Sequence, residues 1–547
     1  MTFRQKLFLL FVLILGLSLR LTNLSSWFQF EFDEEVIAWK LRQLVEFGKP
    51  FLIGGGTPFG FHLGPAFYYL SAVPLFFSRL DPVGWGVAAA VFGTATIWLM
   101  WLAGKTLYNG RIGLMVALLW ATSFTAVMAD RHWWPLVLDP MLSLVVILCL
   151  YKILNQSHKS SRSASWRSGD LVIDKIAASQ TPRNDNLVWW VALGATLAFA
   201  WQADLTVLPL FLAAGVVAVL NFRRQWKGIL IAGGILLISF LPLIFFEMRH
   251  PGANLGKLMQ WSNVSSLQRI NFSTLLFIPQ SLSKLLFPVS NLDGNLLKFY
   301  SWCKEIADGR VGNQPWWVVV VVMGLLIFPF LYVIPAKAGI YLNRFRVKHG
   351  MTDEADRILR ILILSGIGGI FIFRSRGGNL YDFYLAVLYP VVILLAAGVL
   401  DFIWEKWGKI VAVSVLGIIV GFNLFIISKS YHPQGLAVKQ QAVAWAISNV
   451  GKEEFDLDSI SNCSRYNGIR YLFLLGGKEP QSSFVDPDLS WLYDKKGGYM
   501  KPRYLVTFIT PDDLTPEQNK QYNQLKTESI ESKFFNSSLE VIISGYE

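Results

Sequence analysis

The chain has 547 residues, of which 53% are hydrophobic and 16% are charged, and its mean hydropathy is +0.44. This composition is typical of an integral membrane protein, because each bilayer-spanning helix needs about 20 mostly apolar residues. The net charge of +12 does not indicate nucleic-acid binding, since the basic residues lie in loops between apolar segments. Three cysteines are too few for a disulfide framework or a zinc site.

The first apolar segment is followed at once by an acidic cluster. Arg4 and Lys6 precede the segment as in a signal peptide, but no small-residue cleavage pattern follows, so an uncleaved helix is predicted. Next comes Glu31-Phe32-Asp33-Glu34-Glu35, with four carboxylates in five residues. Each would cost about 2.5–3.5 kcal/mol at the bilayer centre. Carboxylates at a membrane face, where lipid-borne substrates arrive, indicate chemistry.

Apolar segments along the chain predict eleven membrane-spanning helices, at 5–22, 84–104, 112–129, 136–152, 187–203, 205–220, 229–246, 316–334, 359–373, 384–400 and 409–427. A twelfth run, 64–77, is short and contains Pro65 and Pro74, which favours a re-entrant or interfacial helix. Only if it does not cross do all four basic loops, 105–111, 152–186, 223–227 and 337–357, fall on the cytoplasmic side. The loops 23–83, 130–135, 247–315 and 374–383 and the tail after 430 are then outside.

Several residues suited to catalysis and binding gather on this outer face. The candidates are Asp33 and Glu34 in the first loop, His62 near its end, Arg131 in the second, Asp139 just inside the next helix, Asp204 in the third, Arg249 and His250 in the fourth, and Arg374, Arg376 and Tyr381 in the fifth. A carboxylate can act as a general base toward a sugar hydroxyl, and arginines offer forked donors to phosphate. This combination suits glycosyl transfer from a lipid phosphate.

Each of these features also has an ordinary interpretation. Asp33–Glu35 could be a solvated helix N-terminus favoured by the macrodipole. Arg374 and Arg376 could be loop or headgroup-binding charges, and Asp139 could cap its helix. His62 and His250 are residue types that more often have structural roles, and the residues alone leave these alternatives open.

The tail has a different composition, with shorter hydrophobic periods and interleaved charges. Val438–Ser448 has a helical pattern, and Ile469–Leu475, Arg503–Ile509 and Leu539–Ile543 have strand patterns. We therefore predict a mainly α protein in two parts: a polytopic membrane helix bundle at 1–430, and a small soluble extracytoplasmic α/β domain at 431–547.

The order of the motifs resembles a known family. An Asp-Glu pair in the first outer loop, the stretch His62-Leu63-Gly64-Pro65-Ala66-Phe67-Tyr68-Tyr69 closing it, an Arg…Trp…Pro second loop and a late aromatic segment ending in Tyr389-Pro390 are similar to GT-C glycosyltransferases. The similarity is to the group of protein O-mannosyltransferases and aminoarabinose transferases, glycosyltransferase family 39, over roughly 5–430. It implies a multi-helix bundle with interfacial helices in the first outer loop.

The resemblance also implies an activity and site roles. It implies inverting transfer of a monosaccharide from a polyprenyl-phosphate donor, with Asp33 at the catalytic centre and Glu34 as second member. Val137-Leu138-Asp139-Pro140 is similar to the aminoarabinose transferase pattern, whereas Arg131–Pro135 is similar to a variant that needs no acid there. No inserted trefoil domain is recognisable in 247–315, which puts a protein acceptor in doubt.

Cofactor and partners follow from the same reasoning. A divalent cation stays open, with Asp33, Glu34 and Asp139 as candidate oxygen ligands. The partners implied are a polyprenyl-phosphate-linked sugar, a lipid, glycan or protein acceptor, and membrane lipids, without nucleic acid. The expected location is a bacterial inner membrane, with the active site and the tail domain extracytoplasmic. Glu31 and Glu35 are interpreted as ordinary loop and helix-start charges.

Two rival hypotheses belong to other classes. A transporter or flippase for lipid-linked sugars would place its charges within helices along a pathway, whereas most charges here lie in loops. A membrane scaffold would act through its outer tail and would not need Asp33.

Overall fold

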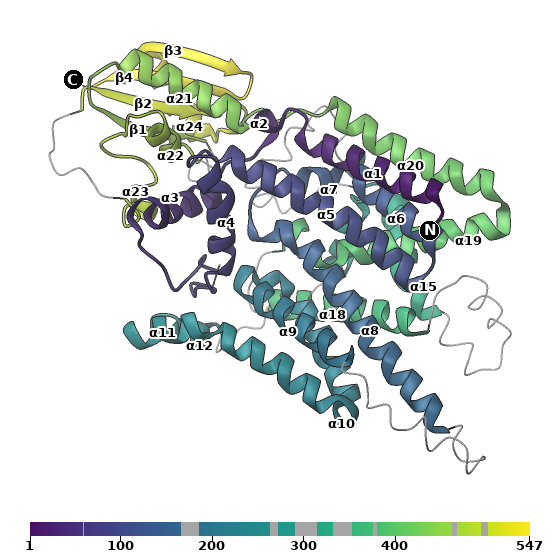
Figure 1. Cartoon of the computed structure of the whole chain (residues 1–547). Helices are drawn as coiled ribbons and strands as arrows, with labels where there is room; N and C mark the ends of the chain where they lie inside the picture. Colours follow the sequence, from purple (N-terminus) through teal and green to yellow (C-terminus); the bar gives the residue numbers. More distant parts are fainter. Residues whose placement is uncertain are drawn as a thin grey trace.

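The computed structural model describes residues 1–57, 59–165, 185–262, 272–289, 314–331, 353–375, 380–461, 468–493 and 502–546. Helices make up most of this part of the chain, and a small sheet lies at one end of the helix bundle (Figure 1). The predicted class, a mainly α bundle with a small α/β domain, is confirmed.

The bundle is built from helices that differ greatly in length. They are α1 (Phe3–Leu21), α5 (Val83–Leu107), α6 (Gly110–Thr122), α7 (Phe124–Ala129), α8 (Asp139–Ser165), α9 (Asp185–Ala203), α10 (Leu208–Ser239), α11 (Leu241–Arg249), α12 (Leu255–Ser262), α13 (Phe272–Ser283), α15 (Trp316–Leu331), α18 (Asp353–Ser375), α19 (Tyr389–Trp407) and α20 (Lys409–Lys429). Short 3-10 helices, η1 (Pro135–Leu138), η4 (Leu205–Val207) and η7 (Asp382–Leu388), precede α8, α10 and α19.

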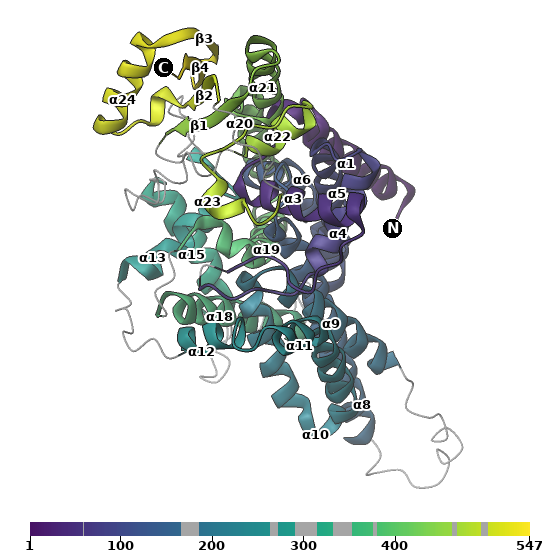
Figure 2. The same cartoon turned by 90° about the vertical axis from the view of Figure 1, so that its left-hand side faces the viewer.

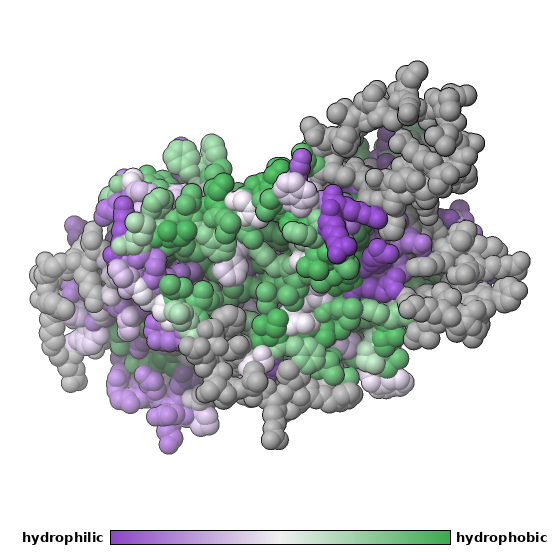
Figure 3. All heavy atoms as spheres, turned by 90° about the horizontal axis from the view of Figure 1, so that it is seen from below, coloured by the Kyte–Doolittle hydropathy of each residue, from purple (hydrophilic) through white to green (hydrophobic). Residues whose placement is uncertain are grey.

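By length and composition, six helical stretches of the described residues could cross a membrane. They are Val83–Leu107, Pro135–Asn155, Leu205–Arg249, Asp353–Ser375, Asp382–Trp407 and Lys409–Lys429, and four shorter apolar helices accompany them. Apolar side chains spread over the face seen from below (Figure 3). This identifies an integral membrane protein, because lipid, unlike water, favours such a surface.

The stretch Leu205–Arg249 is a helical hairpin rather than one long helix. The backbone leaves the helical conformation at Gln225 (φ −129°, ψ 23°). The ring of Trp201 lies 6.3 Å from that of Phe211 and 5.6 Å from that of Phe240, two residues that a straight helix would separate by about 44 Å. The turn falls in the basic segment 223–227, where the sequence predicts it, and Trp190 Nε1 donates to Gln225 Oε1 at 2.7 Å.

The predicted span 112–129 is interrupted. Ser123 adopts an extended conformation (φ −60°, ψ 121°) and ends α6, and α7 follows directly. The break is tolerated because its polar groups have partners: the Ser123 hydroxyl donates to Leu285 O at 2.9 Å and the Phe124 N–H donates to Asn423 Oδ1 at 2.8 Å. Nothing in the local sequence pattern signals these distant partners.

The first loop, residues 23–83, contains three helices, α2 (Leu24–Trp27), α3 (Phe32–Phe47) and α4 (Ala66–Phe77). The 12 residues of α4 span about 18 Å, well short of a hydrocarbon core of about 30 Å. This length agrees with the prediction that 64–77 does not cross the membrane.

The tail forms a four-stranded sheet of β1 (Phe455–Ile460), β2 (Tyr504–Ile509), β3 (Ser529–Asn536) and β4 (Leu539–Gly545), in the order β1-β2-β4-β3. β1 pairs with β2 in parallel and the other pairs are antiparallel. Its helices are α21 (Leu436–Val450), α22 (Arg470–Leu475), α23 (Asp486–Leu489) and α24 (Pro516–Thr527), with a 3-10 turn, η9 (Pro511–Asp513). Figure 2 shows α22 and α23 beside α3.

The sequence prediction for the tail was correct for three elements and wrong for one. α21, β2 and β4 match the predicted segments, but Ile469–Leu475, predicted as a strand, contains helix α22. A short apolar run has no period that separates a strand from a buried helix. Here topology decides, because a parallel β1–β2 pair needs a crossover connection, and α22 lies in that connection. β1 and the exposed edge strand β3 were not predicted.

Candidate functional site

The acidic cluster begins helix α3. Glu31 and Glu34 form a reciprocal capping box, in which the Glu31 N–H donates to Glu34 Oε2 at 3.1 Å. The acidic first turn also faces the positive end of the helix dipole. The ordinary interpretation as a helix start therefore holds for Glu31, and the capping role fixes where α3 begins.

The next three carboxylates of the cluster point to different partners. Asp33 is exposed, whereas Glu34 and Glu35 are fully buried. Glu34 forms an ion pair with His132, whose Nε2 lies 2.5 Å from its Oε1. Glu35 accepts a hydrogen bond of 2.6 Å from the backbone N–H of Tyr471 in the tail. The interpretation of Glu35 as an ordinary helix-start charge is wrong, because this carboxylate joins the first loop to the sheet domain.

Asp33 is the carboxylate of the three that is open to solvent. The protein surrounds it closely enough for desolvation to raise its pKa to about 6, with the negative charge of Glu34 as the next cause and His132 acting in the opposite direction. The carboxyl of Asp204, from the loop between α9 and η4, also contributes. A carboxylate with this pKa is mostly ionised at neutral pH and can still accept a proton in a reaction.

His132 comes from the second loop, residues 130–135, and lies between two neighbours. Its ring stacks on Trp134 with centroids 4.3 Å apart, and Glu34 is on its Nε2. Burial opposes charging of the imidazole, but the adjacent carboxylate of Glu34 outweighs this, so the pKa of His132 is raised. The backbone of this loop is fixed as well, since the Gln29 N–H donates to Arg131 O at 3.1 Å.

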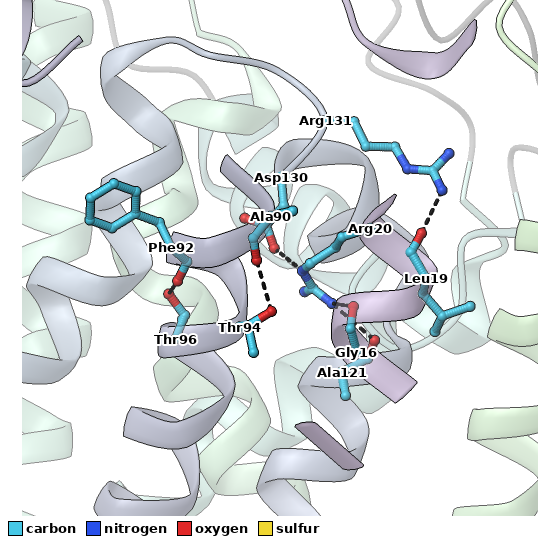
Figure 4. A network of polar contacts seen from close by, with 10 residues as sticks. All are labelled: Gly16, Leu19, Arg20, Ala90, Phe92, Thr94, Thr96, Ala121, Asp130 and Arg131. Atoms are coloured by element: carbon cyan, nitrogen blue, oxygen red, sulfur yellow. Dashed lines mark hydrogen bonds and ion pairs between the residues drawn. The ribbon is translucent and has the colours of Figure 1, made fainter. Parts of the chain in front are cut away.

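A buried ion pair anchors the second loop to α1 (Figure 4). Arg20 Nε donates to Asp130 Oδ2 at 2.6 Å, and its Nη1 donates to the carbonyls of Gly16 at 3.0 Å and Ala121 at 3.3 Å. A Cβ on Gly93 would overlap the Asp130 carboxylate and lie 2.6 Å from Arg20 Nε, so a glycine makes room for the pair. Sequence reasoning missed Arg20, because an arginine near a helix end ordinarily reads as a topology signal.

Arg131, predicted to bind the donor phosphate, points to the end of α1 instead (Figure 4). Its Nη2 donates to the carbonyls of Leu19 and Thr22, and its guanidinium lies 4.6 Å from the Trp27 ring centroid. The side chain is buried, with 2% exposed. In this position Arg131 satisfies C-terminal carbonyls of a helix, which gives the predicted phosphate role no support.

Two more acids meet through a threonine. Thr206 Oγ1 donates to Asp139 Oδ2 at 2.6 Å, and the Thr206 N–H donates to Asp204 Oδ1 at 2.7 Å. Asp139 is fully buried at the start of α8, and its Oδ1 has no hydrogen-bond partner within the part of the chain that the structure describes. Asp139, at the start of α8, is thus linked through Thr206 to Asp204, which precedes η4. The predicted role of Asp139 as a helix cap does not account for this link.

Aromatic side chains from the fifth loop lie near Asp204 and Asp33. Tyr381 and Tyr384 lie with ring centroids 5.1 Å apart, and Tyr384 also packs 5.1 Å from Phe373. The charges of Asp204 and Asp33 both act on the phenol of Tyr384. Arg374 lies in the last turn of α18, one residue after Phe373. Arg376 lies outside the described residues.

The end of the first loop is a narrow glycine-rich hairpin. The Gly54 N–H donates to Leu63 O at 2.8 Å and the Leu63 N–H donates to Gly55 O at 3.0 Å. His62 on this hairpin is held by Asn254, whose Oδ1 accepts from the His62 N–H and whose Nδ2 donates to the His62 carbonyl at 3.0 Å. Burial, followed by the charge of Lys40, lowers the pKa of His62.

The fourth-loop candidates lie at the edge of the site. Arg249 and His250 are exposed at the end of α11, and His250 packs on Phe246 at 4.9 Å. Their neighbour Glu247 accepts from the N–H groups of Asn254 and Leu255 at 3.0 Å and 3.1 Å. Glu247 thus positions the asparagine that holds His62, a link that the sequence does not signal.

The metal candidates do not form a ligand set. Within the described residues no group of three or more histidine, cysteine, aspartate or glutamate side chains converges as a metal site would require. Glu34 is engaged by His132 and Asp139 by Thr206. Among the described side chains, the three candidates therefore form no ligand set for a cation.

The sequence matches no family model and no curated protein. Among solved structures, the chain is similar to the oligosaccharyltransferase of Archaeoglobus fulgidus in complex with zinc and sulfate, with a TM-score of 0.50 and 12% identity over 91% of this chain and 67% of that chain. The fold is of the GT-C type. ArnT from Cupriavidus metallidurans bound to undecaprenyl phosphate is also similar, with a TM-score of 0.47 and 14% identity over 98% of this chain and 99% of that chain.

The GT-C fold agrees with the architecture that the motif resemblance implies. At 12% identity the likeness concerns the fold alone, so activity has to be argued from the residues of the site. Those residues come from three segments whose charges act on Asp33: the acidic start of α3, the second loop through His132, and the loop before η4 through Asp204.

Proposed function

We propose that this protein is an integral membrane glycosyltransferase that transfers a monosaccharide from a polyprenyl-phosphate donor to an acceptor hydroxyl, with inversion. The observation that carries the proposal is Asp33, an exposed carboxylate whose pKa is raised to about 6 among fixed polar residues. The shared fold with an oligosaccharyltransferase supports a transferase. The acceptor is a lipid, a glycan or a protein.

In this proposal Asp33 is the general base. Its carboxylate takes the proton of the acceptor hydroxyl while that oxygen attacks the anomeric carbon of the sugar. The bond between the anomeric carbon and the phosphate oxygen breaks, and the polyprenyl phosphate leaves with the electron pair. Asp33 ends the reaction protonated, and its pKa of about 6 lets it release that proton to water at neutral pH.

Glu34 supports the base without touching the substrate. Its carboxylate is buried, caps α3 and pairs with His132, so it holds the helix start that presents Asp33. The predicted catalytic pair is thus divided into a base and a positioning residue.

Donor and acceptor contacts remain part of the proposal. We assign Arg374 and Tyr381 to the donor side, next to the aromatic group around Tyr384, and His62 to the hairpin side. Arg376, which lies outside the described residues, is proposed for the donor phosphate from the sequence alone. Arg249 and His250 lie further out, where an acceptor would approach, and Asp139 supports Asp204 through Thr206. Arg131 is left out of the binding set because it caps α1.

The proposed setting is a bacterial inner membrane with the site on the outer side. The basic loops support this orientation through the positive-inside rule. We propose the division of the chain at residue 430 into a membrane domain and an extracytoplasmic domain. The tail then lies on the same side as Asp33, as the contact between Glu35 and Tyr471 requires.

The proposal is tested with purified Asp33→Asn protein and a panel of labelled polyprenyl-phosphate sugars. Transfer should be lost while the melting temperature in detergent stays at the wild-type value. Glu46→Gln is the matched control, because Glu46 lies on the same helix and pairs only at the surface with Arg42. Near-normal turnover of Asp33→Asn would contradict the assignment.

The rival function, a flippase for lipid-linked sugars, would leave the sugar–phosphate bond intact. Charged residues inside membrane helices would favour a flippase. Arg20 is a charged residue inside a helix, but its charge is already compensated by Asp130. Release of free polyprenyl phosphate from the labelled donor separates the two functions, since only the transferase produces it.

A further inference from the structure

Lys40 is a buried cation on the same helix as Asp33. It follows Asp33 by seven residues, which is about two turns, so both side chains lie on one face of α3, about 10.5 Å apart along the axis. Its exposed fraction is 7%. Among the residues that the structure describes, no carboxylate forms an ion pair with it.

The contacts that Lys40 makes within the described part of the chain include no opposite charge. Its Nζ donates one hydrogen bond, to Gly54 O at 3.0 Å, although an ammonium group has three donors. Its other neighbours are two aromatic rings, Tyr68 at 5.0 Å and Trp491 at 5.4 Å from Nζ to the centroid. Aromatic faces and one carbonyl attract a cation, but buried charges in proteins are ordinarily paired with an opposite charge.

The hairpin beside Lys40 brings the Gly54 carbonyl and the Tyr68 ring close to the ammonium. The glycines of the hairpin pack tightly: a Cβ on Gly54 would overlap Gly64 O, and a Cβ on Gly55 would lie 3.4 Å from the Tyr68 hydroxyl. That hydroxyl is within electrostatic range of Asp33. The phenol of Tyr68, on α4, thus lies near both the ammonium of Lys40 and the carboxylate of Asp33 on α3.

We propose that Lys40 binds the phosphate of the lipid-linked donor, with the sugar held between Lys40 and Asp33. This inference rests on the proposed function and names the anion-binding residue of that site. A phosphate supplies the missing counter-charge and accepts the remaining N–H groups of the ammonium. Burial lowers the pKa of Lys40 to about 8, so most of it is charged at pH 7 and the site is ready for an anion.

The tail domain closes this site from the other side. Trp491, which covers Lys40, belongs to the tail, and Gln43 Nε2 donates to Leu492 O at 2.7 Å, which fixes that segment on α3. The ordinary alternative is that Lys40 only ties the hairpin to α3 through Gly54. That role would require the hydrogen bond but no preference for a phosphate.

The test measures binding of undecaprenyl phosphate and of the uncharged alcohol undecaprenol to purified protein in detergent. Lys40→Met should weaken binding of undecaprenyl phosphate by about 10- to 100-fold, the range for a charge-assisted hydrogen bond, and leave binding of undecaprenol unchanged. Lys40→Arg should restore most of the affinity. Lys49→Met is the matched control, because Lys49 is an exposed lysine just beyond the end of α3.

Three results would overturn the inference. One is equal binding of undecaprenyl phosphate by Lys40→Met and wild type. Another is an equal loss for the phosphate and the alcohol, accompanied by a lower melting temperature, which identifies a structural role. The third is displacement of undecaprenyl phosphate by phosphatidylglycerol at equal concentration, which identifies a site for ordinary lipid headgroups.

The result of the Lys40 binding test can be distinguished from the result of the Asp33 transfer test. If Asp33→Asn loses transfer and Lys40→Met binds the donor phosphate normally, the inference fails and the glycosyltransferase stands. If Lys40→Met loses binding and Asp33→Asn still transfers sugar, the phosphate site stands and the role of Asp33 as base fails.

Discussion

Glu34 and His132 form a buried ion pair that joins the first loop to the second, with His132 Nε2 2.5 Å from Glu34 Oε1. The same glutamate caps helix α3, and the same loop is tied to α1 through Arg20 and Asp130. The exposed base Asp33 is therefore presented by a helix whose first turn is held on two sides.

This pair predicts a pH-dependent part of the stability. The pKa of His132 is raised in the folded protein, so its contribution is fully present below the unfolded value of about 6.5 and is lost as pH rises through the folded pKa. Glu34→Gln should remove that contribution. Melting temperatures of wild type and Glu34→Gln in detergent should differ most below pH 6.5 and converge at higher pH; a constant difference would contradict this assignment.

The raised pKa of Asp33 predicts the pH profile of transfer. A base must be ionised, so kcat/KM should rise with pH, level off above about 6, and fall about tenfold per unit in more acidic solution. Binding of the donor, measured separately over the same range, should not follow this curve. A flat kcat/KM profile between pH 5 and 7 would argue against Asp33 as the proton acceptor.

The ion pair of Arg20 and Asp130 predicts strong coupling between two substitutions. Arg20→Met leaves a buried carboxylate without its partner and should destabilise the protein by about 3–5 kcal/mol. Arg20→Met combined with Asp130→Leu should recover most of that loss, since an apolar pair can replace a buried ion pair. Thermal melts of the single and double variants give the coupling, and additive losses would show that the pair does not act as a unit.

The tight packing of Gly93 predicts that a larger residue at this position would disturb the ion pair of Arg20 and Asp130. Gly93→Ala puts a methyl group into the Asp130 carboxylate and should cost about 1–3 kcal/mol. Gly215→Ala in α10 is the control, because nothing lies within 4 Å of its Cβ position, and alanine there should be neutral or stabilising. Comparable melting temperatures for the two variants would show that the space beside Gly93 is not tightly filled.

The hydrogen bond of Lys439 predicts that this lysine helps to dock the tail domain against the first loop. This buried lysine of α21 donates to Phe30 O at 2.7 Å, just before the acidic cluster. Lys439→Met leaves that carbonyl unsatisfied and should weaken docking of the tail by about 1.5–3 kcal/mol. Limited proteolysis should then cut the tail faster and transfer should fall, whereas Lys452→Met, an exposed lysine of the same domain, should behave as wild type. Unchanged proteolysis of Lys439→Met would contradict a docking role.

The fold was largely predictable from the sequence because its signals are local. Runs of apolar residues identify membrane helices wherever they occur. The basic segment 223–227 predicts a turn, and the structure confirms it, because Phe211 and Phe240 from either side of that turn both pack on Trp201. The acidic start of α3 is visible for the same reason, since capping and the helix dipole act within one turn. The helix break at Ser123 and the helix at 470–475 were not predicted, because contacts with residues far along the chain determine both conformations.

The sequence by itself determined that this is a polytopic membrane protein with carboxylates beside its first helix. Only the tertiary structure decided which carboxylate is open, because Asp33, Glu34 and Glu35 are chemically alike and differ in what the fold places against them. It also placed Arg131 at the end of α1 and left Lys40 buried with no ion-pair partner among the residues that the structure describes. Burial and pairing are properties of residues brought together from distant segments, and no local pattern encodes them.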